Sequence, residues 1–138
     1  MKLGRWALPV LLVAACGGGQ SVFSLEVGTC FDDQGEGQIS SVPAVDCAEA
    51  HDNEVFALID YAQGESFPGD SAIMDAGRRL CIEQFEPFVG TDYQDSVLEV
   101  FAITPTEQSW EDGDREIICA LYNMDLSKLT GSMRGTAR

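Results

Sequence analysis

The residues of this sequence with the clearest chemistry are its five cysteines. Four of them follow an N-terminal segment with the features of an export signal, and an even number of cysteines in an exported protein favours disulfides over free thiols. Three pairings are open, and we favour the one that joins Cys30 to Cys47, because these residues lie in segments expected to be neighbours in space. The same argument joins Cys81 to Cys119. None of the four is spaced as C-x-x-C and His51 is the only histidine, so no metal site is expected.

The remaining cysteine, Cys16, has a different expected chemistry. It ends the run LVAAC, which resembles the bacterial lipobox, where a cysteine after small residues is acylated on its sulfur and becomes the mature N-terminus. Residues 1–15 begin with basic side chains and continue as an apolar run too short to span a membrane, as in a signal peptide. We therefore expect a signal peptide over 1–15, and a lipidated Cys16 within a flexible tether over 16–24 that anchors the protein to a membrane.

A second group of residues has the types needed for acid–base chemistry. His51 and Asp52, with Glu54 close by, could serve as a general base and its orienting carboxylate. No serine lies in a G-x-S-x-G elbow and the four paired cysteines are expected to be oxidised, so the sequence offers no nucleophile for acyl transfer. A lone histidine in a turn is more often structural, and we expect no catalytic residue and no cofactor here.

Two acidic loops complete the candidates. A pair of carboxylates within 111–116 would suit glycoside hydrolysis, but a chain of 138 residues leaves little scaffold for a polysaccharide cleft, so an exposed acidic turn is favoured. The segment 32–37, DDQGEG, resembles the start of a calcium loop. Its twelfth position is Pro43, where that loop needs an acid, so a solvated turn is favoured there as well.

Short strands and one helix must position these residues. Runs rich in β-branched and aromatic residues predict strands at 25–31, 41–46, 53–61, 96–104 and 115–122. One helix is predicted from Asp70 to Glu86, ended by Pro87, and it carries Cys81 toward the last strand. The predicted fold class is therefore α+β: an antiparallel sheet of about four to five strands with one main helix packed on it, and two disulfides.

The charge of the chain limits its partners. It has 8 basic and 23 acidic side chains and a net charge of -15. Nucleic acid is therefore not expected as a partner, and anionic lipid headgroups repel the folded domain, so membrane contact is expected through the lipid on Cys16. The length suits one domain.

Three blocks of sequence resemble the septum-formation domain family. They are VGTCFD at 27–32, VPAVDC at 42–47 followed by HDNEVF at 51–56, and the residues Pro105, Trp110, Gly113, Arg115 and Cys119 of the last block. The resemblance implies an exported lipoprotein or membrane protein of actinobacteria with a role near the division septum, and it implies no enzymatic reaction. We place this domain at 25–125 and expect a loosely ordered tail over 126–138.

The expected function follows from anchoring, disulfides and the missing nucleophile. We expect a non-enzymatic binding module, lipid-anchored on the extracytoplasmic face of the cell membrane, whose partner is an unidentified envelope or division protein or a wall component. The alternatives are a small wall-modifying hydrolase and a small-ligand carrier. The candidate interaction surface consists of polar or aromatic residues that a core does not require. They are His51, Asp52, Glu54, Trp110, Asp114 and Arg115.

Overall fold

The computed structural model describes residues 20–21, 24–35 and 41–138. The expected signal peptide and the lipidated Cys16 lie outside the described residues, as does most of the expected tether. Within the described residues, no helix is long and apolar enough to cross a membrane.

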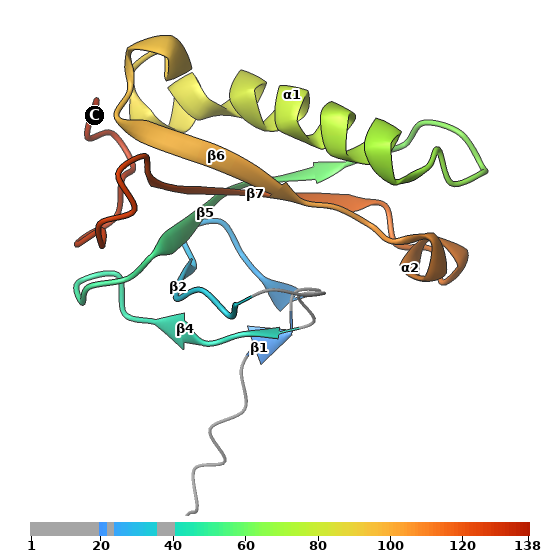
Figure 1. Cartoon of the computed structure of the whole chain (residues 1–138), viewed down its shortest axis with the longest axis horizontal. Coiled ribbons are helices and arrows are strands. Elements are labelled where there is room, and N and C mark those ends of the chain that lie inside the picture. Colours follow the sequence, from blue (N-terminus) through green and yellow to red (C-terminus); the bar gives the residue numbers. More distant parts are fainter. Residues whose placement is uncertain (1–19, 22–23, 36–40) are drawn as a thin grey trace, which may run out of the picture.

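The main sheet has five antiparallel strands in the order β4-β2-β5-β7-β6 (Figure 1). They are β2 (Cys30–Phe31), β4 (Ala44–Val45), β5 (Asn53–Asp60), β6 (Leu98–Ile103) and β7 (Glu116–Asn123). The three long strands coincide with the β-branched and aromatic runs, because such side chains suit a half-buried pleated surface. Together with the main helix and both disulfides, this sheet confirms the predicted α+β fold class.

The N-terminal strands are shorter than the sequence predicts. Gly28 has a φ of 94° and its N–H donates to the Val55 carbonyl, so the chain turns there and β2 begins only at Cys30. Further along, β3 (Ser41–Val42) pairs with β1 (Gln20–Ser21) in a separate two-stranded sheet. Pro43 separates β3 from β4, which is consistent with its missing N–H donor.

One long helix, α1 (Asp70–Val89), lies along one face of the sheet (Figure 1). It continues through Pro87 for two residues, so the predicted end at Glu86 is wrong. The burial of Phe88 and Val89 offsets the hydrogen bond that proline cannot donate, and Gly90 ends the helix in the left-handed region. Two short helices follow, η2 (Tyr93–Asp95) and α2 (Glu107–Glu111).

The sheet separates two apolar clusters. The larger one, under α1, holds fully buried residues of the helix and of the strands that face it, among them Phe85, Leu98 and Leu121. A β-bulge in β5 between Val55 and Ala57 turns two consecutive residues toward this side. The smaller cluster lies on the other face, where Leu25, Phe31 and Val42 cover part of β5 and β7.

Both favoured disulfides are confirmed. Cys30 is bonded to Cys47, with Cα atoms 5.3 Å apart, and joins β2 to the loop after β4. Cys81 is bonded to Cys119 and joins the middle of α1 to β7, with both residues fully buried. The second bond therefore crosslinks the helix to the sheet through the larger cluster.

The C-terminal segment 126–138 is not loosely ordered as predicted. Leu129 and Met133 are 1% and 2% exposed, so apolar side chains fix the segment to the domain. Its backbone also donates to the end of α1, from Gly135 N to the Phe88 carbonyl and from Ala137 N to the Val89 carbonyl. Figure 1 shows this red segment beside that end of the helix.

Candidate binding site

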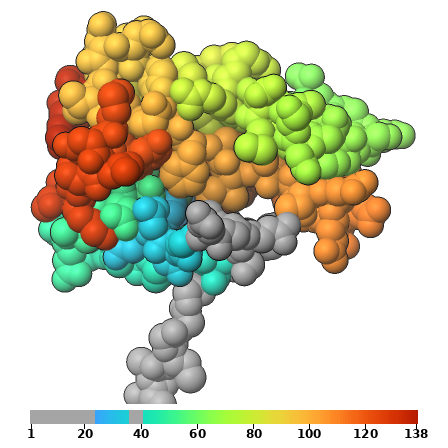
Figure 2. Space-filling view, in the orientation of Figure 1, coloured from blue at the N-terminus to red at the C-terminus, as the bar shows by residue number. Residues whose placement is uncertain are grey.

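A cavity of about 460 Å³ opens on the sheet face opposite α1. Its apolar lining comes from residues of β2, β3, β6 and β7. Its polar lining comes mainly from the loops after β2, before β5 and after β7. The lining residues are Phe31, Asp32, Asp33, Gln34, Gly35, Val42, Asp52, Asn53, Phe101, Tyr122, Asn123, Leu126 and Ser127. Figure 2 shows the segments that carry them meeting on one face of the molecule.

The apolar part of this pocket is built by strand alternation. Residues of β6 and β7 alternate between the faces, so Leu98 and Leu121 lie under α1 whereas Phe101 and Tyr122 lie on the pocket side. The Phe101 and Tyr122 rings contact each other with centroids 6.0 Å apart. Phe31, from β2, adds a third ring to this lining. The result is a partly exposed apolar floor on an otherwise well-covered sheet.

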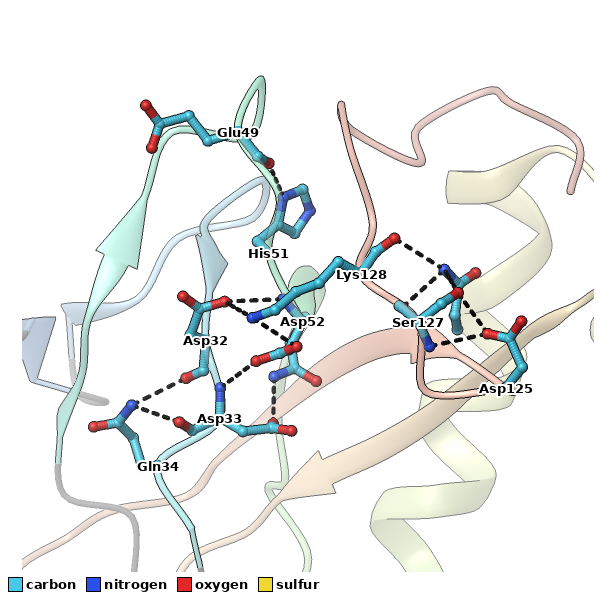
Figure 3. A network of polar contacts seen from close by, with 11 residues as sticks. Asp32, Asp33, Gln34, Glu49, His51, Asp52, Asp125, Ser127 and Lys128 are labelled. Carbon is cyan, nitrogen blue, oxygen red and sulfur yellow. Dashed lines mark hydrogen bonds and ion pairs between the residues drawn. The ribbon is translucent and has the colours of Figure 1, made fainter.

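Two polar lining residues of the pocket, Asp32 and Asp52, belong to an ion-pair network with Lys128, which lies beside the pocket (Figure 3). The Lys128 Nζ lies 2.7 Å from Asp32 Oδ1 and 2.9 Å from Asp52 Oδ1. These hydrogen bonds, the one to Asp32 first, raise the pKa of the Lys128 ammonium. Burial alone would raise the pKa of Asp52, but the hydrogen bond from the Asp33 N–H and the contact with Lys128 lower it overall. The Asp52 carboxylate is therefore held in its ionised form.

Asp33 is the carboxylate of this network that has no cation. Its Oδ1 accepts a hydrogen bond of 2.7 Å from Asn53 Nδ2, which is a neutral amide. In the described part of the chain, no lysine or arginine other than Lys128 lies within ion-pair distance of Asp32, Asp33 or Asp52. Three carboxylates thus face one ammonium, and the pocket rim keeps a negative excess.

The loop after β7 forms another part of the rim. Leu126 is 77% exposed and has a φ of 63°, a left-handed conformation that leucine rarely adopts. The loop around it is well bonded, because Asn123 Nδ2 donates to the Ser127 carbonyl and Asp125 accepts from the Ser127 N–H and hydroxyl. An exposed leucine in a strained backbone conformation is therefore fixed at the edge of the pocket.

Of the three residues predicted as an interaction surface at 51–54, only Asp52 lines the pocket. His51 and Glu54 are buried beneath the C-terminal segment. The His51 ring is fully buried, its Nδ1 lies 2.8 Å from the Glu49 carbonyl, and its backbone pairs with Leu129 in both directions. Figure 3 shows the ring directed toward Glu49 and away from Asp32 and Asp52. The structure thus separates Asp52, at the pocket, from His51, which has no exposed surface for a partner.

Glu54 is fully buried as well and holds the C-terminal segment in place. Its carboxylate accepts hydrogen bonds from Ser132 Oγ at 2.5 Å and Met133 N at 2.7 Å. Glu54 also lies near the sulfurs of Cys30 and Cys47, all within 4.8 Å. These sulfurs are bonded to each other, so they offer no thiolate ligand and the group does not suit a metal ion.

Trp110, Asp114 and Arg115 form a separate structural unit around α2, at the far end of the sheet from the C-terminal segment (Figure 1). The Trp110 ring is 4% exposed, and its Nε1 donates to the Glu65 carbonyl. The Arg115 guanidinium covers it at 3.6 Å from the ring centre. Asp114 accepts a hydrogen bond from Ser109 Oγ. The tryptophan is therefore not a free surface for stacking on a sugar or a peptide.

The acidic loop 111–116 does not form a catalytic carboxylate pair at the pocket. Glu116 begins β7 and lies opposite Asp60 of β5. Burial, followed by the charges of Asp114 and Asp60, raises the pKa of Glu116. None of these three residues lines the cavity on the sheet face.

Sequence reasoning missed most of the pocket. Asp32 and Asp33 stood out only as part of a solvated turn. Lys128, which is 96 residues from Asp32, fell in the segment predicted to be loosely ordered. The apolar residues Leu129 and Met133 lie in the same segment, but a spacing of four is a helix-face signal and the segment is not helical, so no local pattern pointed to the pocket.

Comparison with known proteins identifies a family and two lipoprotein relatives. The family profile described as septum formation matches residues 27–138. A "Putative lipoprotein LppN" of Mycobacterium tuberculosis is 30% identical over 116 residues, and that of Mycobacterium bovis matches equally. The match covers 80% of this chain and 63% of the relatives, so the chain spans under two thirds of their length. No solved structure matches. The chain belongs to the septum formation family.

Proposed function

We propose that this chain is a lipoprotein anchored through Cys16 on the outer face of the cytoplasmic membrane, where it acts as a non-enzymatic binding module of the cell envelope. The lipobox-like run before Cys16 and the lipoprotein name of the mycobacterial relatives support the anchor. Two disulfides suit an oxidising compartment outside the cytoplasm. The family description supports a role in septum formation.

The observation that carries the binding role is the pocket on the sheet face opposite α1. It combines an apolar floor with a few polar groups fixed by their own hydrogen bonds, which is how ligand sites are commonly built. The polar groups at this pocket are carboxylates and amides held in place, and the buried His51 lies away from them. This arrangement favours recognition over catalysis.

Photo-crosslinking in living cells tests this function. A photoreactive amino acid in place of Leu126 puts the probe at the pocket rim, and the same probe in place of Met74 gives a matched control, because Met74 is 61% exposed on α1. We expect a specific adduct from position 126 and none from position 74. Equal adducts from both positions, or none from position 126, would contradict a binding role for this face.

A small-ligand carrier is the second candidate, because a cavity of about 460 Å³ falls in the range of small-molecule sites. This function predicts a molecule that co-purifies with the protein and is released on unfolding. Native mass spectrometry of the membrane-extracted protein decides the question. A mass that agrees with the lipidated chain alone would contradict a carrier function.

A further inference from the structure

The chemistry of the pocket indicates what kind of partner it fits, and this inference rests on the proposed binding function. The pocket has two zones. The first is the apolar floor of Phe31, Phe101 and Tyr122, and the second is the acidic rim that begins at Asp32 and Asp33. A partner that fills both zones needs an apolar group and a positively charged group close to each other.

The rim already binds one ammonium group, which belongs to the protein itself. Lys128 Nζ bridges Asp32 and Asp52 at 2.7 and 2.9 Å. That contact leaves the Asp33 carboxylate with a neutral donor, the Asn53 amide, while the Asp33 N–H donates to the Asp52 carboxylate. A second cation at Asp33 would reduce the excess of these three carboxylates from two negative charges to one.

The apolar surface extends beyond the cavity. Met124 N donates to the Val97 carbonyl, and the register of β6 and β7 continues the alternation from Tyr122, so Val97 and Met124 lie on the pocket face. They are 53% and 57% exposed, and Leu126 adds a third exposed apolar side chain at the rim. This strip of exposed apolar side chains beside an acidic rim suits a polypeptide segment that carries both apolar and basic side chains.

The conformation of Leu126 supports a contact at the strip. A left-handed backbone conformation at a non-glycine residue costs free energy of a size similar to the net contribution of one hydrogen bond to stability. The side chain recovers little of that cost by packing, because it is the most exposed of the large apolar side chains among the described residues. Asparagine or glycine would suit the turn better, so the fold itself gives no reason for a leucine at this position.

We propose that this face binds an extended polypeptide segment of an envelope protein in which a lysine or arginine lies within two residues of an aromatic or branched aliphatic residue. The basic side chain contacts Asp33 at the rim. The apolar side chain enters the pocket over Phe101 and Tyr122, and the segment continues along Leu126. A membrane surface is the less favoured occupant, because the acidic rim repels anionic headgroups.

A peptide library tests the inference directly. The full-length lipidated protein in detergent micelles is exposed to a random nine-residue peptide library, and the bound peptides are sequenced. We expect enrichment of a basic residue next to an aromatic or aliphatic one. Bound peptides without a basic preference, or no enrichment at all, would overturn the inference. Adducts at position 126 in cells would still support the proposed function, so the two failures are distinguishable.

Two variants sharpen this test. Asp33→Asn should weaken the selected peptides by about tenfold and remove the basic preference while the apolar preference remains. Leu126→Asn should weaken them without lowering the melting temperature, since asparagine tolerates the left-handed region. Met74→Gln is the matched control on α1 and should bind as wild type. Loss of binding only together with loss of the fold would reduce Leu126 to a structural residue and overturn its assigned contact.

Two further probes separate the other occupants. Phenethylamine supplies the same cation and aromatic ring as a small molecule, and vesicles of phosphatidylglycerol supply an anionic membrane. We expect both to bind at least tenfold more weakly than the selected peptides. Phenethylamine that binds as tightly as the peptides would indicate a small-ligand carrier. Pocket-dependent binding to the vesicles would indicate that the face contacts a membrane surface. Either result would overturn the proposal that the partner is a polypeptide.

Discussion

The two faces of the sheet differ in how completely they are covered. On one face α1 runs along β6 and β7, buries Phe85 and Leu121 completely, and is crosslinked by the disulfide between Cys81 and Cys119. On the other face short N-terminal strands cover part of β5 and β7 and leave Phe101 partly exposed beside a cavity. The helix face is therefore the more completely packed of the two, whereas the other face carries the surface that we propose for contact with a partner.

The largest effect should come from the disulfide on the helix face. Replacing both Cys81 and Cys119 by alanine opens a crosslink that spans 38 residues, which costs about 4 kcal/mol in the chain-entropy model. The matched variant without Cys30 and Cys47 opens a span of 17 residues, for which the same model gives about 3 kcal/mol. Urea unfolding of both measures the difference. A larger loss of unfolding free energy in the variant without Cys30 and Cys47 would contradict the larger contribution expected from the disulfide on the helix face.

A smaller effect is expected where α1 approaches β6 most closely. A Cβ atom at Gly77 would lie 2.9 Å from the Ala102 Cβ and 3.0 Å from the Thr104 Cγ2. Gly77→Ala should therefore lower the free energy of unfolding by about 1–3 kcal/mol, partly offset by the better helix propensity of alanine. Thermal unfolding measures it. A Gly77→Ala protein as stable as wild type would show that the helix face is looser than described.

The next effect depends on pH and concerns the start of β7. The pKa of Glu116 is raised, so its neutral form is favoured in the fold, and stability is lost as pH rises from the ordinary glutamate pKa through the raised value. Glu116→Gln should remove that loss and stabilise the protein at neutral pH by less than about 1 kcal/mol. Unfolding curves at acidic and neutral pH compare the two proteins. A variant less stable than wild type at neutral pH would contradict the direction of the shift.

The smallest change in stability is expected at the pocket. Leu126→Asn should leave the free energy of unfolding unchanged or raise it by about 0.5 kcal/mol, because asparagine accepts the left-handed backbone and little packing is lost. Chemical denaturation measures this effect, with Met74→Gln as the control. A loss of more than about 1 kcal/mol would show that Leu126 packs in the fold, and the contrast between the faces would weaken.

The sequence predicts the framework of this domain better than its surface. The long strands and the main helix follow from local patterns around residues such as Val55 and Cys81, because burial and pairing constrain side-chain type strongly. The favoured disulfide pairing follows from which of these elements are expected to be neighbours. The packing of the C-terminal segment depends on Met133 and Glu54, which are 79 residues apart, and no local pattern encodes that contact. For the same reason Trp110 resembled a surface residue until its contacts with Arg115 and the Glu65 carbonyl were visible.

An NMR titration of the protein with peptides selected from the library tests the proposed contact surface directly. Amide and methyl shifts report every face at once, so binding is located without a choice of site in advance. We expect shifts at Asp33, Phe101 and Leu126 and unchanged signals along α1. Shifts confined to α1, or to the loop of Trp110, would contradict the claim that the uncovered face of the sheet is the contact surface.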